Sequence, residues 1–386
     1  MSALFEDKLD EEREFDFFGL NENPFPYSPV PSNEPNIYCD QEDVRKRLFE
    51  VLKNTISTGK SNHLIITGKY GNGKSHTLKY ANKLLKKQER TVSSYVAQPG
   101  EDFVDIYHEI IYDLGYDFFN KLAHEHLLKV IKEDDENEID INTAEELEKA
   151  IKQGDILLTD KISVAIKDLK EETKFIDFAR AFIHLVYEET SLYAWQWLSG
   201  EGLRYEQRKK MEIHTNIDDG NKAVRALESI KKILKQLNYN SIVIFIDEFE
   251  SIERLSSKRK QKLLNSLRHF MDTNPKGLSL IIACAPELWS EVMAEYHAFS
   301  ERIGNQVDLK PLDKKELEKL INKYISTYKG ENKKPKNPFT ENSLQEILEL
   351  SHGNIRRAIL ICGRAFEKAN QKNKKKIDTK LINSIT

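Results

Sequence analysis

One segment constrains this chain more than any other: Gly68-Lys69-Tyr70-Gly71-Asn72-Gly73-Lys74-Ser75. It fits the pattern G-x-x-x-x-G-K-[ST], follows the apolar run His63–Thr67, and leads into helical periodicity that continues to Lys87. The glycines let backbone N–H groups curl around phosphate oxygens, because no Cβ atom obstructs them. A strand, a glycine-rich turn and a helix in this order predict a nucleoside-triphosphate site that extends from Gly68 to His76.

The polar side chains of this segment have separate expected roles. Lys74 reaches the β- and γ-phosphates as a point charge, and the Ser75 hydroxyl ligates Mg²⁺. The helix that begins at Ser75 directs the positive end of its dipole toward the anion. The cofactors predicted here are ATP or GTP together with Mg²⁺.

A second motif distinguishes between the two nucleotides. The apolar strand Ile242–Ile246 ends in Asp247 and Glu248, where a P-loop protein needs an acid for its metal ion. Asp247 is the predicted Mg²⁺ partner, and Glu248 is placed to orient or deprotonate an attacking water. Such an acidic pair, and the absence of a guanine-reading N-K-x-D pattern, favour ATP hydrolysis over a GTP switch.

Strand and helix signals alternate along the chain. The predicted strands are His63–Thr67, Thr91–Val96, Ser241–Ile246, Leu278–Cys284 and Gln306–Leu309. Helical patterns between them predict an α/β fold with a parallel sheet flanked by helices. We expect three parts: an acidic, proline-rich arm over residues 1–40, whose aromatics pack on the domain behind it, an ATPase core over 41–310, and an all-α domain over 311–386.

A long helical insertion is predicted within the core. Strand signals vanish between about residues 116 and 220, where amphipathic segments remain. Nine acids lie between Glu133 and Glu148; we expect a solvated face and not a metal site, because their spacing is not that of a calcium loop. Thr143 and Glu146 have the spacing of a capping box, which predicts a helix start there.

Composition excludes several classes of protein. The 59 Lys and Arg against 63 Asp and Glu give a net charge of −4, which excludes a uniformly basic coat for nucleic acid. The three cysteines have no paired spacing, so neither a disulfide framework nor a structural zinc site is expected. An acidic N-terminus and the lack of long apolar runs indicate a cytoplasmic protein without membrane association.

The order of these motifs resembles that of the AAA+ ATPases, over residues from about 40 to 386 apart from the insertion. Within that group the chain looks most like the origin-recognition initiators, ExeA-type ATPases and TniB-type transposition regulators. Phe18-Gly-Leu-Asn-Glu-Asn-Pro24-Phe25 is similar to the ExeA-type start, and Ile282–Leu288 to a strand-then-P-E-L segment of the group. The stretch Trp195–Glu201, with the long helix running into Asp247-Glu248-Phe249-Glu250, looks like ATPases of BREX-type phage-defence operons.

The resemblance implies roles for two arginines. Ser351–Ala358 is similar to the sensor-2 motif of the helical lid, which implies that Arg356 touches the γ-phosphate. Arg302 lies where the family's trans-acting arginine finger would sit, across a boundary between copies in a homo-oligomer. The alternative for Arg302 is an ordinary salt bridge.

The chain departs from the AAA+ pattern at sensor 1. The family places a polar side chain at the end of the strand Leu278–Cys284, but here Cys284, Ala285 and Pro286 occupy that place. This departure implies slow hydrolysis or a polar group supplied from elsewhere. We expect Cys284 itself to be a small buried hydrophobic residue.

The resemblance also bears on partners. Initiators usually carry a winged helix after the lid, whereas about one short helix follows Lys376 here, so DNA contact is expected from the ATPase body. Two basic surfaces are candidates. The first is the helix after Asp247, with Arg254, Lys258, Arg259, Lys260, Lys262 and Arg268. The second is the segment over 330–386, which has twelve Lys and Arg against six acids and includes Lys372, Lys374, Lys375 and Lys376. Binding there would be directed at phosphates and independent of sequence. The acidic insertion indicates a protein partner.

Two functions remain open. The first, which we expect, is an oligomeric ATP-driven motor or switch associated with DNA, in phage defence or mobile-element control. The second is a nucleotide-dependent scaffold that assembles protein partners with little turnover. A secretion role is less well supported, because no membrane span follows the ATPase core.

Overall fold

The computed structural model describes residues 15–27, 35–38, 41–133, 141, 143–153, 156–330, 333 and 335–385. Two compact units result: one comprises residues 1–46, 68–80 and 308–386, and the other 47–67 and 81–307. The acidic positions 6 to 14, and positions 134 to 140 of the acidic run, lie outside the described residues. The division into arm, core and helical domain stays a prediction.

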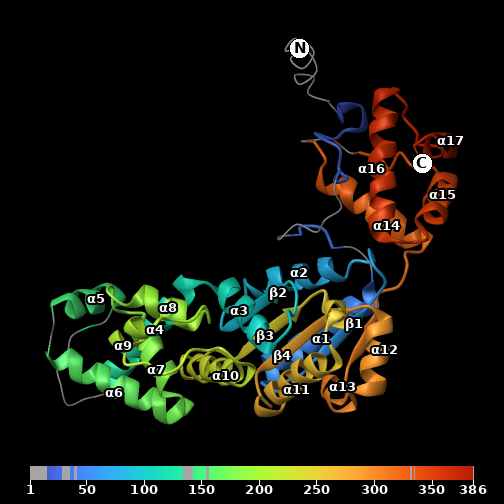
Figure 1. Cartoon of the computed structure of the whole chain (residues 1–386). Helices are drawn as coiled ribbons and strands as arrows, with labels where there is room; N and C mark the ends of the chain where they lie inside the picture. The colour runs from blue at the N-terminus through green and yellow to red at the C-terminus, as the bar shows by residue number, and fades with distance from the viewer. Residues whose placement is uncertain are drawn as a thin grey trace, which may run out of the picture. The chain divides into compact units, whose positions relative to one another are not determined.

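A five-stranded sheet forms the centre of the second unit. Its strands are β1 (Leu64–Thr67), β2 (Thr91–Val96), β3 (Ser241–Ile246), β4 (Leu278–Cys284) and β5 (Gln306–Asp308), in the order β2-β3-β4-β1-β5. Figure 1 labels β1 to β4. The pairs β2–β3, β3–β4 and β4–β1 are parallel. Strands β1, β3 and β4 are buried along their whole length, as expected of the largely apolar strands of a parallel sheet. The predicted α/β fold is confirmed.

Alternate residues of the strands face opposite layers of helices. Ile242, Ile244 and Ile246 join a core with α3 (Phe103–Leu114), α10 (Gly220–Gln236) and α11 (Ser257–Thr273). On the other face, Thr55 of α1 (Glu42–Thr58) shares a hydrogen bond of 2.8 Å with Ser279 of β4. After β4 the chain forms α12 (Pro286–Glu295) and α13 (His297–Ile303).

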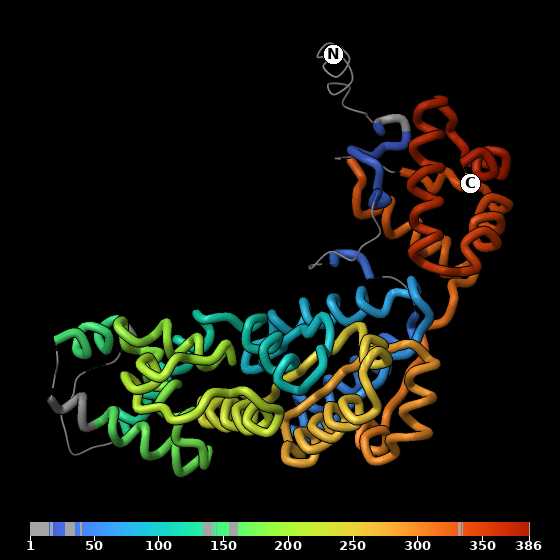
Figure 2. Tube along the Cα trace, in the orientation of Figure 1, coloured from blue at the N-terminus to red at the C-terminus, as the bar shows by residue number. Residues whose placement is uncertain are grey.

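The predicted helical insertion is confirmed. Its helices are α4 (Tyr116–Glu133), α5 (Ala144–Gln153), α6 (Ile156–Thr173), α7 (Ile176–His184), α8 (Ser191–Leu198) and α9 (Tyr205–Lys210). They gather to one side of the sheet (Figure 2), and the described residues between α3 and α10 contain no strand. The capping box is also present: the Glu146 N–H donates to the Thr143 hydroxyl at 3.2 Å, and the Thr143 N–H to the Glu146 carboxylate at 3.1 Å.

A buried carboxylate fixes the end of the insertion. Asp177 of α7 is 4% exposed, and it accepts hydrogen bonds from the backbone N–H groups of His214 and Thr215 at 3.1 and 2.9 Å. The Thr215 hydroxyl adds a third at 2.8 Å. Three donors compensate the burial of this carboxylate and hold the segment before α10 against α7.

Helices from the C-terminal part of the chain make the core of the first unit. They are α14 (Lys314–Thr327), α15 (Glu341–Ser351), α16 (Ile355–Gln371) and α17 (Thr379–Ile382). The short helix η2 (Phe15–Phe18) packs with them: the Phe18 ring lies 4.4 Å from that of Phe366, and the Phe25 ring 5.9 Å from it. Phe15, Phe18 and Phe25 of the arm are therefore core residues, and Phe366, which all three contact, lies more than 300 residues further along the chain.

Among all the helices that the structure describes, none combines the length and the apolar character that crossing a bilayer would demand.

Candidate nucleotide site

The glycine-rich segment forms a tight loop between β1 and α2 (Lys74–Leu85). Gly71 and Gly73 have φ values of 83° and 93°, in the left-handed region that side chains disfavour. A Cβ atom on Gly71 would also lie 2.5 Å from the side-chain oxygen of Asn354. Both the backbone conformation and the available space therefore require glycine at position 71.

Lys74 is drawn into this loop. Its side chain is 8% exposed, and its Nζ donates to the Gly68 carbonyl at 2.8 Å. Ser75 lies half-buried in the first turn of α2, where the N–H groups of a helix start are unpaired. Glycines at positive φ, a lysine and a helix start are the groups that a triphosphate needs, so the segment fits the predicted cofactor.

His76 holds the segment before α1. Its Nε2 lies 2.5 Å from the Ile37 carbonyl, and its ring stacks 6.2 Å from that of Tyr38. Burial lowers the pKa of His76, so the ring is neutral at pH 7 and Nε2 carries the proton that it donates. A direct contact of His76 with a nucleotide stays a prediction.

Residues at the start of α16 form hydrogen bonds with the same loop. The Asn354 side chain donates to the Tyr70 carbonyl at 2.6 Å, and the Arg356 N–H donates to the Gly71 carbonyl at 3.2 Å. The Arg356 guanidinium lies 4.7 Å from the centre of the Tyr70 ring and donates to the Tyr70 hydroxyl. Arg356 would therefore have to leave this tyrosine in order to reach a phosphate.

The predicted acidic pair follows β3. Asp247 is 2% exposed, whereas Glu248 is exposed and has φ 45° and ψ 38°. That left-handed conformation is costly for a residue with a Cβ atom, and such strain concentrates at functional sites. Gly68 follows the last residue of β1 and Asp247 follows the last residue of β3, so each motif begins at the carboxyl end of a strand of the parallel sheet.

Two polar residues that sequence reasoning missed hold this pair. The Tyr95 hydroxyl of β2 donates to Asp247 at 2.6 Å, and the Gln98 side chain donates to Glu248 at 2.5 Å. Burial first, and then the Asp247 charge, raise the pKa of Tyr95, so its hydroxyl stays protonated. Tyr95 and Gln98 could have been found as polar residues at the end of the strand that neighbours β3. This inference, however, requires knowing the order of the strands in the sheet.

Removing the Tyr95 hydroxyl tests this contact. In Tyr95→Phe the buried Asp247 carboxylate loses a donor, and we expect the free energy of unfolding to fall by about 2 kcal/mol. Urea unfolding measures this, with Tyr205→Phe as the matched control, because Tyr205 is 66% exposed. Equal losses of stability in the two variants would contradict the assigned contact.

Arg302 and Cys284, for which the sequence analysis also made predictions, lie in the unit that contains the sheet. Arg302 pairs with Asp272 of the same chain at 2.5 Å, so the salt bridge named as its alternative is present. Cys284 is fully buried at the end of β4, as expected of a small hydrophobic residue.

Ion pairs neutralise half of the cations in the first basic surface, the helix after Asp247. Three cations of this segment form ion pairs: Arg259 with Glu101, Lys260 with Glu291, and Lys262 with Asp102. Among the described residues no ion pair is present for Arg254, Lys258 or Arg268. The lysines at 372, 374, 375 and 376 are exposed.

The metal donors predicted at this site are few. The described residues contain no group of three or more His, Cys, Asp or Glu side chains that could hold an ion. Mg²⁺ binds few protein ligands and keeps waters and nucleotide phosphates in its shell. Ser75 and Asp247 belong to different units, and their role as Mg²⁺ ligands stays a prediction.

Comparison with known proteins identifies the family. The model of the family described as BREX system ATP-binding protein BrxC/D matches residues 41–369. The chain belongs to this BrxC/D family. The match includes the glycine loop, the acidic pair and Arg356, so this BrxC/D chain is an ATP-binding protein.

Other similarities are more distant. An uncharacterized HTH-type transcriptional regulator of Methanocaldococcus jannaschii is 26% identical over 140 residues, which are 36% of the BrxC/D chain and 33% of that protein. The Aeropyrum pernix ORC2 protein in its ADPNP-ADP complexes has a TM-score of 0.49 at 14% identity, over 96% of this chain and 70% of its own. The Aeropyrum pernix ORC1 protein in complex with DNA has a TM-score of 0.45 at 14% identity, over 91% and 65%.

Proposed function

We propose that this BrxC/D-family chain hydrolyses ATP in a Mg²⁺-dependent reaction. The observation that carries the proposal is the acidic pair at the end of β3: a buried aspartate held by Tyr95, followed by an exposed glutamate in a strained conformation. An exposed carboxylate beside a buried one separates two tasks, since the first can accept a proton while the second stays with a cation.

The residues divide the work as follows. The backbone N–H groups from Lys69 to His76 and the Lys74 ammonium would hold the phosphates, and Ser75 and Asp247 would hold Mg²⁺. When bound, the ion neutralises charge on the phosphate oxygens. Glu248 would orient the attacking water and accept its proton, and Gln98 sets the resting position of its carboxylate.

Two arginines would complete the site. Arg356 would report the γ-phosphate by exchanging its contact with Tyr70 for one with the nucleotide, which changes how α16 holds the loop. Arg302 would act in trans in a homo-oligomer after releasing Asp272. Both steps replace an exposed or half-buried contact of modest strength with one to a phosphate.

We propose DNA as the partner and phage defence as the setting, with the protein in the cytoplasm. The family description, which names the BREX system, supports the setting. Two candidates for sequence-independent phosphate contacts are the exposed lysines 372, 374, 375 and 376, and the cations Arg254, Lys258 and Arg268 around α11. A protein partner at the helical insertion is proposed as well.

A second candidate is a nucleotide-dependent scaffold with little turnover. The observation that favours it is the end of β4, where the buried Cys284 and the following Ala285 and Pro286 offer no polar side chain for the attacking water.

ATP turnover with and without DNA discriminates between the two. We expect turnover to increase when double-stranded DNA is added at low salt, and this increase to disappear at high salt as phosphate contacts are screened. ATP binding without turnover under both conditions would favour the scaffold and refute the motor.

A further inference from the structure

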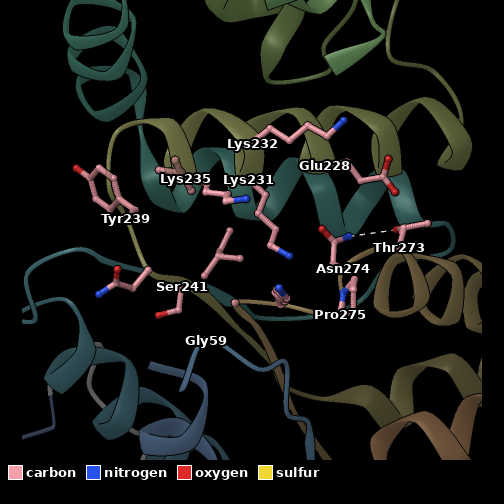
Figure 3. A pocket seen from close by; sticks show the side chains of 15 residues that line it. Gly59, Glu228, Lys231, Lys232, Lys235, Tyr239, Ser241, Thr273, Asn274 and Pro275 are labelled. Atoms are coloured by element: carbon pink, nitrogen blue, oxygen red, sulfur yellow. Dashed lines mark hydrogen bonds between the residues drawn. The ribbon is translucent and has the colours of Figure 1, made fainter. Parts of the chain in front are cut away.

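The sheet unit contains a pocket at the opposite edge of the sheet from the acidic pair. It lies at the amino ends of β3 and β4, has a volume of about 530 Å³, and is closed on one side by the C-terminal half of α10 (Figure 3). Its wall includes Ser241 and Ile242 of β3 and the loop from Thr273 to Gly277. This volume is typical of small-molecule sites.

The charge of this pocket is strongly positive. Four lysines line it, Lys231, Lys232 and Lys235 from α10 and Lys276 from the loop before β4, against the single acid Glu228. The Lys232 ammonium is engaged by the Glu172 carbonyl at 2.7 Å. The other three lysines have no hydrogen-bond or ion-pair partner among the described residues.

Lys231 is the residue that an ordinary surface role does not explain. A lysine in the last turn of a helix compensates the negative end of its dipole, and in α10 that residue is Lys235. Lys231 lies one turn earlier, is half-buried, and extends from the helix into the pocket toward the loop of Asn274 (Figure 3). Burial, together with the neighbouring charge of Lys235, lowers the pKa of Lys231 to about 8, although the charge of Glu228 acts in the opposite direction.

The remaining wall suits a small organic anion. Leu234, Ile242 and Pro275 give apolar surface, whereas Asn240 and Tyr239 bring polar groups. Gly277 has φ 68°, and a Cβ atom there would lie 2.8 Å from the Asn240 carbonyl, so the loop passes close to the strand and narrows the pocket. Lys231 is half-buried and its charge interacts with that of Glu228, but one acid does not balance four lysines, and an anion in the pocket would compensate the remaining positive charge.

We propose that this lysine pocket binds a small phosphate-bearing molecule, no larger than a mononucleotide, with Lys231, Lys235 and Lys276 as its cationic ligands. The pocket volume fits a molecule of this size, the excess of lysines favours an anion, and the compact ammonium groups suit phosphate oxygens. This site is separate from the proposed ATP site and does not rest on it.

Calorimetric titration with inorganic pyrophosphate tests the proposal. The full chain carries Lys74→Ala and the buffer contains a chelator, so that binding at the glycine loop is suppressed. Adding Lys231→Gln should weaken pyrophosphate binding at least tenfold, whereas adding Lys53→Gln, an exposed lysine of α1, should change it less than twofold. Melting temperatures check that each variant folds, and the pair Lys235→Gln and Lys276→Gln replaces Lys231→Gln if that variant does not.

The pH dependence gives a second readout. Affinity for pyrophosphate should fall between pH 7 and 9, because Lys231 loses its proton at about 8. Among the groups near it, His63 has a pKa lowered to about 4 and stays neutral in this window, and burial raises the pKa of Tyr239. The other charged groups that line the pocket are Glu228, Lys232, Lys235 and Lys276.

Three outcomes would overturn the proposal. Pyrophosphate does not bind at millimolar concentration, or it binds equally well to the Lys231→Gln variant. In the third, a short single-stranded oligonucleotide binds and loses tenfold in affinity with Lys231→Gln while pyrophosphate does not bind, which would make the pocket a nucleic-acid contact.

Discussion

Replacing Glu248 by glutamine should lower ATP turnover by a factor of about 10²–10⁴, the range that general-base catalysis contributes. Glutamine keeps the shape and the hydrogen-bonding capacity of the side chain but cannot accept the proton of the attacking water. ATP binding should remain, because the phosphate contacts are proposed to come from the glycine loop. Steady-state phosphate release and equilibrium binding of labelled ATP measure the two effects separately.

The control for this prediction is a glutamate in the short helix that follows Glu248. Glu253 is also an exposed glutamate, in the element η3 (Phe249–Arg254) that follows Glu248, and Glu253→Gln removes the same charge without touching the strained position. Turnover of that variant should stay within about twofold of the parent, as for a surface substitution. If Glu248→Gln retained more than a third of the parent's turnover, Glu248 could not be the base.

The second large effect is expected from Lys74→Ala. The Lys74 ammonium is predicted to contact two phosphates, and each charge-assisted contact contributes about 1.5–3 kcal/mol, so its loss should weaken ATP binding by about 10² or more. At an ATP concentration of about 100 times the dissociation constant, the parent gains about 2.7 kcal/mol of stability, whereas the variant would gain about 0.4 kcal/mol. Thermal unfolding with and without Mg-ATP measures this difference.

Lys69→Ala is the matched control. Lys69 lies in the same loop, but its side chain is exposed and the predicted contribution of this position is its backbone N–H, which alanine retains. Its stabilisation by ATP should therefore equal that of the parent. Lys74 also donates to the Gly68 carbonyl, so the unfolding of both variants without nucleotide shows any cost to the loop itself. An undiminished ATP effect in Lys74→Ala would exclude the glycine loop as the nucleotide site.

Features encoded by residues close together in sequence were predictable. The capping box at Thr143 and Glu146 depends on a spacing of three residues, and the structure contains it. Strand β4 was predicted with the bounds that it has, because a buried parallel strand is largely apolar and only Ser279 interrupts the apolar residues of this one. The conformation of Gly71 and Gly73 likewise follows from a local pattern in which only glycine tolerates the required φ values.

Features that depend on strand order were not predictable from patterns. Tyr95 and Gln98 contact the acidic pair only because β2 lies beside β3, in a register that places Val96 opposite Ile246. The strand pattern of Thr91–Val96 is the same whichever neighbour the strand takes. Arg302 illustrates the same limit, since its partner Asp272 lies 30 residues away on another helix.

The sequence by itself determined the class of fold, the glycine loop and the acidic pair, because hydrophobic periodicity and phosphate-binding turns are properties of short segments. The tertiary structure decided which distant segments share a core. Phe18 and Phe25 pack against Phe366. The Asn23 side chain donates a hydrogen bond to the Gly363 carbonyl, and the Asn354 side chain donates one to the Tyr70 carbonyl. Burial of apolar surface is not directional, so it stabilises any well-packed contact regardless of the separation of the residues along the chain. Which residues form the contact is therefore known only from the folded structure.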